Sequence, residues 1–333
     1  MATDKLAAPR PVYRPKLYKT LLSVPEIGAV AAVAVFFIVF TALDKTMAQA
    51  DNLARMALQG SMIGLAAFGM SFLMIAGEID LSAGATAGLA AAVAGMLRVY
   101  LGWPELACYA TAVAVGALVG LINSLIVLRF RMPSFFATLG MSFVVAGLTN
   151  WMLQGAWIDF IDRIPMLRSV LTASPIFGLP WLFLMVLLAY IVGDLLIRLT
   201  VLGPILAAVG GNRQAAEIVG INVPRVKTLC FVFCSMIGAV AGVAVGGYAG
   251  MTDYSIGIDW MLWIIAIAII GGGSLRGGVG SVIGAFLGTV LVEIIRTGLF
   301  DAHVQHNAQG IVIGAVLVGA AILDALRRKS AQY

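Results

Sequence analysis

Charged residues are scarce in this sequence, and their scarcity excludes the commonest class of protein. Asp, Glu, Lys and Arg together make up 11% of the 333 residues, while hydrophobic residues make up 61%. Soluble domains carry about 25% charged residues, so an ordinary soluble fold is excluded. A chain of this length accommodates roughly ten membrane spans of about 20 residues with short connections. The composition therefore predicts an all-α, polytopic integral membrane protein.

Cysteine and histidine are also rare, and the nucleotide-binding phosphate loop is absent. Cys108, Cys230 and Cys234 all lie in apolar runs, where small buried thiols are far commoner than disulfides or metal ligands. His303 and His306 have no third ligand beside them, so we expect no metal site. No Lys-Ser or Lys-Thr pair follows a glycine, which rules out the phosphate-binding loop G-x-x-x-x-G-K-[ST]. We therefore expect no cofactor on this chain, and any ATP must be hydrolysed by another subunit.

Ten apolar runs are candidate membrane spans. They lie near residues 27–43, 56–76, 83–101, 105–128, 135–154, 178–197, 228–249, 260–272, 278–296 and 309–326. If the N-terminus is cytoplasmic, most of the 21 Lys and Arg residues fall in inside segments, as the positive-inside rule requires. We therefore expect both termini in the cytoplasm, with a basic segment at 1–26, a transmembrane domain at 27–326 and a basic tail at 327–333. The net charge of +5 then reports topology, and no nucleic-acid partner is expected.

The stretch GEIDLSAG at 77–84 places two acids, Glu78 and Asp80, directly after an apolar run. An isolated ionised carboxylate in hydrocarbon is costly, so both acids need a partner or water. Asp80 and Ser82 are common N-cap residues in front of the next apolar run, so they either cap a restarting helix or contact substrate. Glu78 is expected to face water, Arg276 or a partner chain.

Two glycine-bearing regions, 73–95 and 268–288, resemble each other. Each is apolar, breaks at a polar stretch and resumes with glycines four residues apart. A broken helix in each half of the chain is a common transporter plan, so this pair is either an internal repeat or a coincidence between two glycine-rich spans. Asn123 and Asn150 lie within apolar runs and bond either a substrate or a neighbouring helix.

The most polar long connection on the inside is VGGNRQAAEIVGINVPRVK, at 209–227, within a loop of about 200–227. Asn212 is a good N-cap, residues 213–219 form about two helical turns, and Gly220 is a natural helix stop. This segment contains several apolar side chains outside the membrane: Ala215, Ala216, Ile218, Val219 and Ile221. Such a helix either folds back on its own surface or docks into a partner protein that drives the adjoining spans.

Three stretches resemble the permease subunits of ATP-binding-cassette importers for monosaccharides. GEIDLSAG resembles their G-G-I-D-L-S-x-G signature, MPSFFATLGMS (132–142) their P-x-F-I-A-T-L-G segment, and AVGGNRQAAEIVGI (208–221) their G-x-N-x-x-A-A-x-x-x-G-I loop. GGGSLRGGVGSVIGAFLG (271–288) is similar to their late glycine-rich segment. The resemblance covers about residues 50–326 and departs from the signature at Glu78, where the family has glycine.

The resemblance implies a homodimer of permease chains surrounded by lipid in the inner (cytoplasmic) membrane of a bacterium. Two cytoplasmic ATPase subunits would bind ATP and Mg, and a periplasmic or extracellular binding protein would deliver a monosaccharide or polyol. The signature loop comprises Gly77, Glu78, Ile79, Asp80, Leu81, Ser82 and Gly84. The substrate-pathway candidates are Asp80, Ser82, Asn123, Thr138 and Asn150. The ATPase-coupling candidates are Gly211, Asn212, Ala215, Ala216, Glu217, Gly220 and Ile221.

Two alternatives remain open at this point. Within the same superfamily, the substrate would be a branched-chain amino acid or a nucleoside. In a different class, a proton-coupled secondary transporter would use Asp80 or Glu78 as its proton carrier.

Overall fold

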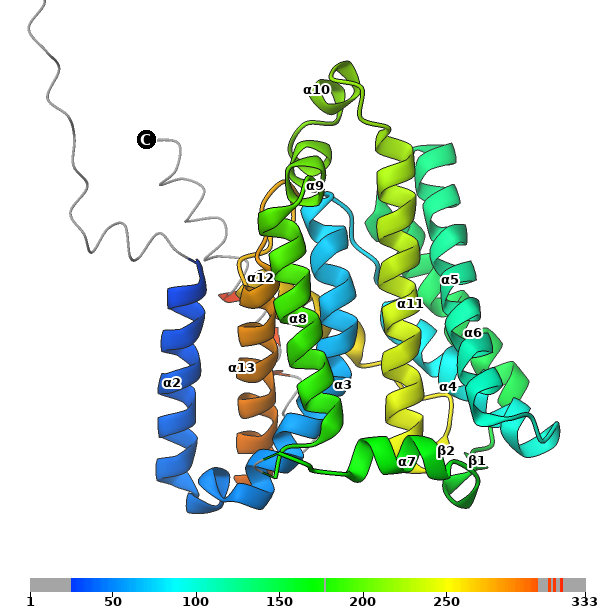
Figure 1. The fold of residues 1–333 in the computed structure, drawn as a ribbon, viewed down its shortest axis with the longest axis vertical. Coiled ribbons are helices and arrows are strands. Elements are labelled where there is room, and N and C mark those ends of the chain that lie inside the picture. The colour runs from blue at the N-terminus through cyan, green and yellow to red at the C-terminus, as the bar shows by residue number, and fades with distance from the viewer. Residues whose placement is uncertain (1–24, 177, 305–310, 313, 316–317, 320–333) are drawn as a thin grey trace, which may run out of the picture.

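The computed structural model describes residues 25–176, 178–304, 311–312, 314–315 and 318–319, which form a bundle of long helices (Figure 1). The helices are α2 (Pro25–Leu43), α3 (Ala50–Ile75), α4 (Ala83–Tyr100), α5 (Glu105–Phe130), α6 (Ser134–Leu153), α7 (Pro165–Thr172), α8 (Trp181–Leu199), α9 (Leu202–Gly211), α10 (Arg213–Ile218), α11 (Val223–Ala249), α12 (Trp260–Ile270) and α13 (Val282–Asp301). Two 3-10 helices, η1 (Lys45–Ala48) and η2 (Ile161–Arg163), and two strands, β1 (Ile158–Asp159) and β2 (Met251–Thr252), complete the described elements. The predicted helical membrane fold is confirmed.

Eight of the described helices are long and apolar enough to cross a membrane: α2, α3, α4, α5, α6, α8, α11 and α13. They coincide with eight of the predicted runs. The run predicted at 260–272 forms α12, whose 11 residues extend only about 16 Å and cannot cross a hydrocarbon core of about 30 Å. Most of the span predicted at 309–326, and both terminal segments at 1–24 and 320–333, lie outside the described residues.

The central helix of the bundle is α11, which packs against α3, α4 and α5 (Figure 1). Glycines lie at the crossing points, because helices in lipid associate through close backbone packing. A Cβ on Gly120 of α5 would lie 2.5 Å from the carbonyl oxygen of Phe231 on α11. A Cβ on Gly69 of α3 would lie 3.0 Å from Cα of Cys234. Larger residues at these glycines would push the helices apart.

The cysteines have no part in disulfides or metal sites in the described structure. All three are free, and their burial agrees with the prediction. Among the described residues, no three His, Cys, Asp or Glu side chains gather in a way that would hold a metal ion. His306 lies outside those residues.

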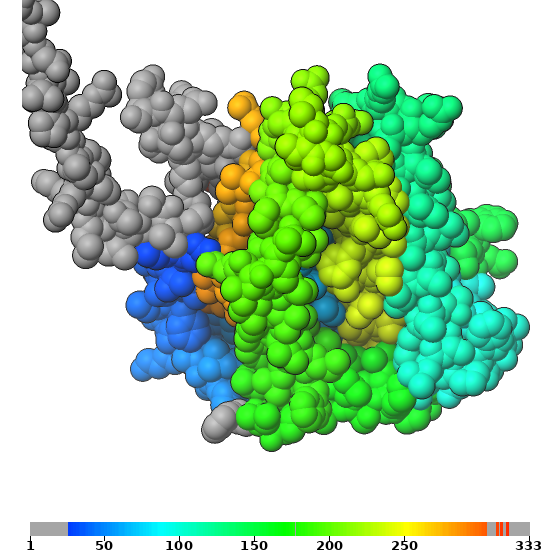
Figure 2. Space-filling view, turned by 45° about the horizontal axis from the view of Figure 1, so that its top comes forward, coloured from blue at the N-terminus to red at the C-terminus, as the bar shows by residue number. Residues whose placement is uncertain are grey.

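The bundle has two distinct ends. The short helices α9 and α10 stand at the top of Figure 1, and Figure 2 turns this end, which we call the α10 end, toward the viewer. At the opposite end β1 pairs antiparallel with β2, with Ile158 opposite Thr252, and α7 lies across the bundle. We call this the β1–β2 end.

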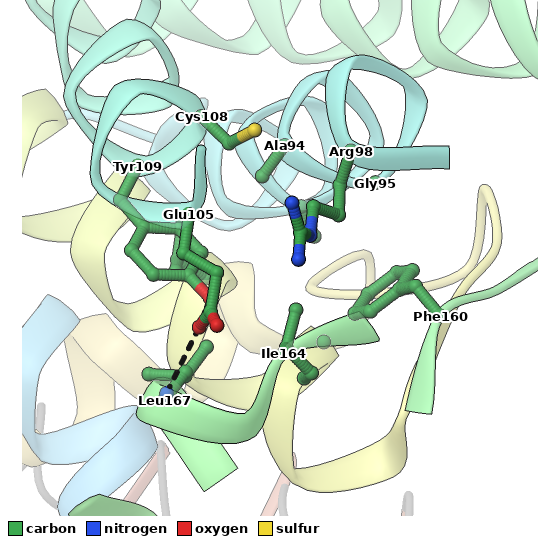
Figure 3. A pocket seen from close by; sticks show the side chains of 12 residues that line it. Ala94, Gly95, Arg98, Glu105, Cys108, Tyr109, Phe160, Ile164 and Leu167 are labelled. Atoms are coloured by element: carbon green, nitrogen blue, oxygen red, sulfur yellow. Dashed lines mark hydrogen bonds between the residues drawn. The ribbon is translucent and has the colours of Figure 1, made fainter. Parts of the chain in front are cut away.

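Glu105 anchors α7 at the β1–β2 end (Figure 3). Its carboxylate accepts hydrogen bonds from the backbone N–H groups of Met166 and Leu167, at 3.2 and 3.1 Å, and from the Tyr109 hydroxyl at 2.9 Å. It thereby satisfies first-turn N–H groups that have no partner within a helix. The cavity between these side chains measures about 10 Å³, room for one water at most, so it is a packing gap.

Candidate functional site

The carboxylate of Asp80 lies at the centre of a buried polar cluster in the α3–α4 connection. Asp80 is 1% exposed. Its Oδ1 accepts hydrogen bonds from the backbone N–H and the hydroxyl of Ser82, at 2.8 and 2.6 Å, and from Nδ2 of Asn123 on α5 at 3.2 Å. Its Oδ2 accepts one from the hydroxyl of Ser235 on α11 at 2.9 Å. These bonds give both carboxyl oxygens of Asp80 a partner, as a buried polar group requires.

Hydroxyls of α6 hold the backbone of the same connection. The N–H of Ile79 donates to Oγ of Ser134 at 3.2 Å, and the N–H of Leu81 donates to Oγ1 of Thr138 at 3.0 Å. Because this stretch is not helical, its backbone N–H groups need partners from elsewhere in the fold. The signature loop is therefore fixed on three sides, by α5, α6 and α11.

The structure brings four of the five predicted pathway residues together. Asp80 and Ser82 belong to the signature loop, and Asn123 and Thr138 donate hydrogen bonds to it or accept them from it. All four residues are 0–1% exposed. Asn150 lies apart from them, exposed near the other end of α6. The prediction that Asp80 or Ser82 caps α4 through its side chain is wrong, because no side chain bonds the first-turn N–H groups of this helix. Asp80 binds the N–H of Ser82, whereas Ser82, the N-cap of α4, makes no capping bond with its side chain.

Glu78 pairs with Lys227 of α11, so the expectation that it faces water, Arg276 or a partner chain is wrong. Nζ of Lys227 lies 2.5 Å from Oε1 of Glu78, and the two side chains are 11% and 12% exposed. The pair ties the signature loop to the helix that follows α10. This pairing could not be predicted from the sequence, because 149 residues separate the two side chains.

Lys227→Met is expected to destabilise the protein more than the double substitution Glu78→Gln with Lys227→Met. The single change leaves a largely buried carboxylate without its counter-ion, which costs about 3 kcal/mol, whereas the double change leaves a neutral amide. Thermal unfolding in detergent measures both. Arg213→Met, which breaks the exposed pair of Arg213 and Glu217, is the control and should shift the melting temperature by about 1 °C or less. Equal melting of the single and double variants would contradict the prediction.

The helix predicted in the inside connection is present as α10. Oδ1 of Asn212 accepts a hydrogen bond from a first-turn N–H at 3.0 Å, and Gly220, with a φ of 86°, follows the end of the helix. Ile218 and Val219 are 85% and 73% exposed, whereas Ala216 is 1% exposed and packs against this chain. The apolar surface that α10 presents outward is therefore that of Ile218 and Val219. Of the other coupling candidates, Gly211, Ala215 and Glu217 are exposed and Ile221 is half-buried.

The last two glycines of α9, Gly210 and Gly211, which directly precede the N-cap of α10, touch two helix breaks. The N–H of Gly278, between α12 and α13, donates to the carbonyl of Ile75 at the end of α3, at 2.9 Å. A Cβ on Gly278 would lie 2.9 Å from Cα of Gly211, and one on Gly77 would lie 3.1 Å from Cα of Gly210. No side chain separates these backbones, so the end of α9 packs directly against both the α3–α4 and the α12–α13 connections.

A second copy of the signature loop, which the sequence analysis missed, lies between α11 and α12. GMTDYSIG at 250–257 carries Gly, Asp, Ser and Gly at the same relative positions as GEIDLSAG at 77–84. Oδ1 of Asp253 accepts hydrogen bonds from the N–H and the hydroxyl of Ser255, at 2.8 and 2.7 Å. The same local turn forms in the first copy. The pattern G-x-x-D-x-S-x-G, searched against the chain itself, is the signal that would have found it.

The two copies meet reciprocally at their last glycines. A Cβ on Gly84 would overlap the carbonyl oxygen of Gly257, and a Cβ on Gly257 would overlap that of Gly84. One copy follows a helix that ends at the α10 end and the other a helix that ends at the β1–β2 end (Figure 1). The copies thus have opposite orientations, as in inverted-repeat transporters. This repeat pairs 77–84 with 250–257, whereas the similarity of 73–95 and 268–288 stays a prediction.

Comparison with known proteins gives a family for this chain. The family described as "Branched-chain amino acid transport system / permease component" matches residues 52–321. The autoinducer 2 import system permease protein LsrC of Klebsiella pneumoniae is 33% identical, with 94% of this chain and 90% of the relative covered. The galactose/methyl galactoside import permease protein MglC of Escherichia coli is 30% identical, with 94% and 97% covered.

A further relative is the xylose transport system permease protein XylH of Escherichia coli, 29% identical with 91% of this chain and 92% of the relative covered. No solved structure matches the chain. The family model spans most of the sequence, and eight described helices are long and apolar enough to cross a membrane. This chain therefore belongs to the branched-chain amino acid transport system permease family and is a multi-pass transport subunit with no catalytic activity of its own.

Proposed function

We propose that this chain is the permease of an ATP-driven importer that carries a monosaccharide or polyol across the bacterial cytoplasmic membrane by alternating access. The printed names of the three relatives concern import of autoinducer 2, galactosides and xylose, which supports a sugar-like substrate over a branched-chain amino acid. An importer of this family works with an ATPase and a substrate-binding protein. We further propose that the ATPase binds ATP and Mg, and that two copies of this chain form the pore.

The ATPase docks on α10 in this proposal. The observation that carries it is a short capped helix that projects from the bundle with Ile218 and Val219 exposed to 85% and 73%. Apolar side chains at such a tip fit a hydrophobic groove on a partner, the usual way in which a helix is recognised. Movement of α10 would then reach both helix breaks through Gly210 and Gly211, at the end of the preceding helix α9. In this arrangement the α10 end faces the cytoplasm, in agreement with the positive-inside rule.

Ile218→Asp is expected to abolish copurification of the ATPase while leaving the permease folded. A charge at the centre of an apolar contact costs about 2–4 kcal/mol, which weakens binding at least about thirtyfold. The measurement is recovery of tagged ATPase with the permease, together with the melting temperature of the permease alone. Leu101→Asp is the matched control, because Leu101 is an aliphatic side chain 62% exposed beyond the far end of α4. Full recovery of ATPase with Ile218→Asp would contradict the docking assignment.

Reconstitution tests the function itself. The permease, a candidate ATPase and a candidate binding protein are placed in liposomes, and uptake of radiolabelled D-galactose or D-xylose is measured with and without ATP. ATP-dependent uptake is the expected result. Uptake driven by a pH gradient without the ATPase would overturn the importer and favour a secondary transporter. Transport of leucine instead of either sugar would overturn the substrate class alone.

A further inference from the structure

A cavity of about 1230 Å³ lies between α3, α12 and α13 at the β1–β2 end of the bundle. The side chains that line it include Arg55, Gln59, Trp260, Arg296 and Phe300. Its volume exceeds the roughly 300–1,000 Å³ of common small-ligand pockets, so a monosaccharide fits with water around it. The cavity faces away from α10 and therefore toward the side on which a binding protein would deliver substrate.

The second copy of the repeat forms one wall of this cavity. Residues 258–263, which directly follow GMTDYSIG, all line it. They include the first turn of α12, which starts inside the bundle, where Gly84 packs against Gly257. In transporters built from inverted repeats, substrate sites form at such broken helices. The cavity is thus at the place where this architecture holds substrates.

The polar side chains of the cavity disfavour an anionic ligand and can bond hydroxyl groups, because the carboxylates of Asp44 and Asp259 line it besides two paired arginines. Arg55 lies 3.7 Å from Asp301, and Arg296 lies 3.1 Å from Glu293, so both arginines are already paired. A phosphate or carboxylate group would find no unpaired arginine among the described lining residues. Gln59 is half-buried, and its side-chain amide has no hydrogen bond within the described part of the chain. Its two donors and its acceptor are therefore available for hydroxyl groups.

We propose that this cavity receives the imported monosaccharide or polyol, with Gln59 bonding a hydroxyl and the half-buried ring of Trp260 packing against the apolar face of the sugar. The inference rests on the proposed function and adds the position at which each chain binds the substrate. It also separates the two copies of the repeat by role. The first copy, whose Asp80 carboxylate accepts donors from the protein itself, positions the helices, and the second shapes the substrate site.

Cysteine labelling in the complete reconstituted importer tests this site. The native cysteines are buried, so a membrane-impermeant cationic methanethiosulfonate reagent added on the binding-protein side reports on an introduced thiol. The thiol of Gln59→Cys should react, and its modification should lower ATP-driven uptake of D-galactose or D-xylose at least about tenfold. Gln49→Cys is the matched control. Gln49 is the exposed N-cap of the same helix and does not line the cavity, so labelling there should leave uptake unchanged.

Gln59→Leu gives a second measurement that does not depend on labelling. It should also reduce uptake at least about tenfold, because the sugar loses a hydrogen bond within the site, while Gln49→Leu should transport normally. The site is overturned if the wild-type importer carries sugar and both the labelled Gln59→Cys and Gln59→Leu carry it equally well. It is also overturned if the thiol of Gln59→Cys reacts no faster than the native cysteines. If the wild-type importer carries neither sugar, the proposed function and the proposed substrate site are both contradicted.

Discussion

Gly84→Ala is expected to abolish transport and to lower the yield of folded permease, although it adds a single methyl group. The added Cβ would overlap the carbonyl oxygen of Gly257, a backbone atom that cannot rotate out of the way. Overpacking a rigid contact costs about 1–3 kcal/mol, and here it forces apart the two copies of the repeat where they meet. We expect uptake to fall more than about tenfold and the melting temperature in detergent to drop by several degrees.

Gly140→Ala is the matched control for this prediction. Gly140 also lies in a helix, α6, but an added Cβ there has nothing within 4 Å. The substitution should be neutral or slightly stabilising, because alanine favours a helix over glycine by up to about 1 kcal/mol. Gly257→Ala is a less clean test, since a φ of 78° at Gly257 adds backbone strain to the steric overlap. Normal uptake by Gly84→Ala would mean that close contact of the two copies is not needed.

Asp80→Ala is expected to lower the stability of the permease strongly and, as a consequence, to lower transport. The change removes the acceptor shared by Ser82, Asn123 and Ser235. Nδ2 of Asn123 keeps its bond to Oγ of Ser82 at 2.8 Å, but the N–H of Ser82 and the hydroxyl of Ser235 lose their acceptor, and each buried donor left without a partner costs about 1–3 kcal/mol. Thermal unfolding in detergent should show a fall of about 10 °C or more, or no folded protein.

Two variants distinguish a positioning role for Asp80 from contact with substrate. Asp80→Asn keeps one acceptor oxygen, and the Ser235 hydroxyl is able to turn and accept from the new amide, so the protein should remain folded. Asp253→Ala alters the equivalent acid of the second copy, which among the described residues accepts bonds from Ser255 alone and is partly open to water. Water replaces the lost acceptor there, so melting should change by about 2 °C or less. An Asp80→Ala protein that melts like wild type but does not transport would contradict the positioning role.

Local chemistry and composition determined the class of this protein and the course of its chain. Hydrophobic runs long enough to span a membrane predict eight of the described helices, because a helix in lipid needs only its own backbone hydrogen bonds and an apolar surface. Asn212 and Gly220 predict the limits of α10 through an N-cap bond and a left-handed backbone, both of which act within a few residues. The motifs that resemble sugar importers agree with the family found by comparison.

Only the tertiary structure decided what the polar residues in those helices do. Asp80 finds donors on α5 and α11, and Glu78 finds Lys227, through contacts between segments far apart in the chain. The relation between Gly84 and Gly257 became visible because each occupies the space where the other would place a side chain. A sequence pattern reports the neighbours of a residue along the chain, whereas a buried carboxylate is stabilised by whichever donors the packed helices bring to it. That is why the spans could be predicted and the roles of their acids could not.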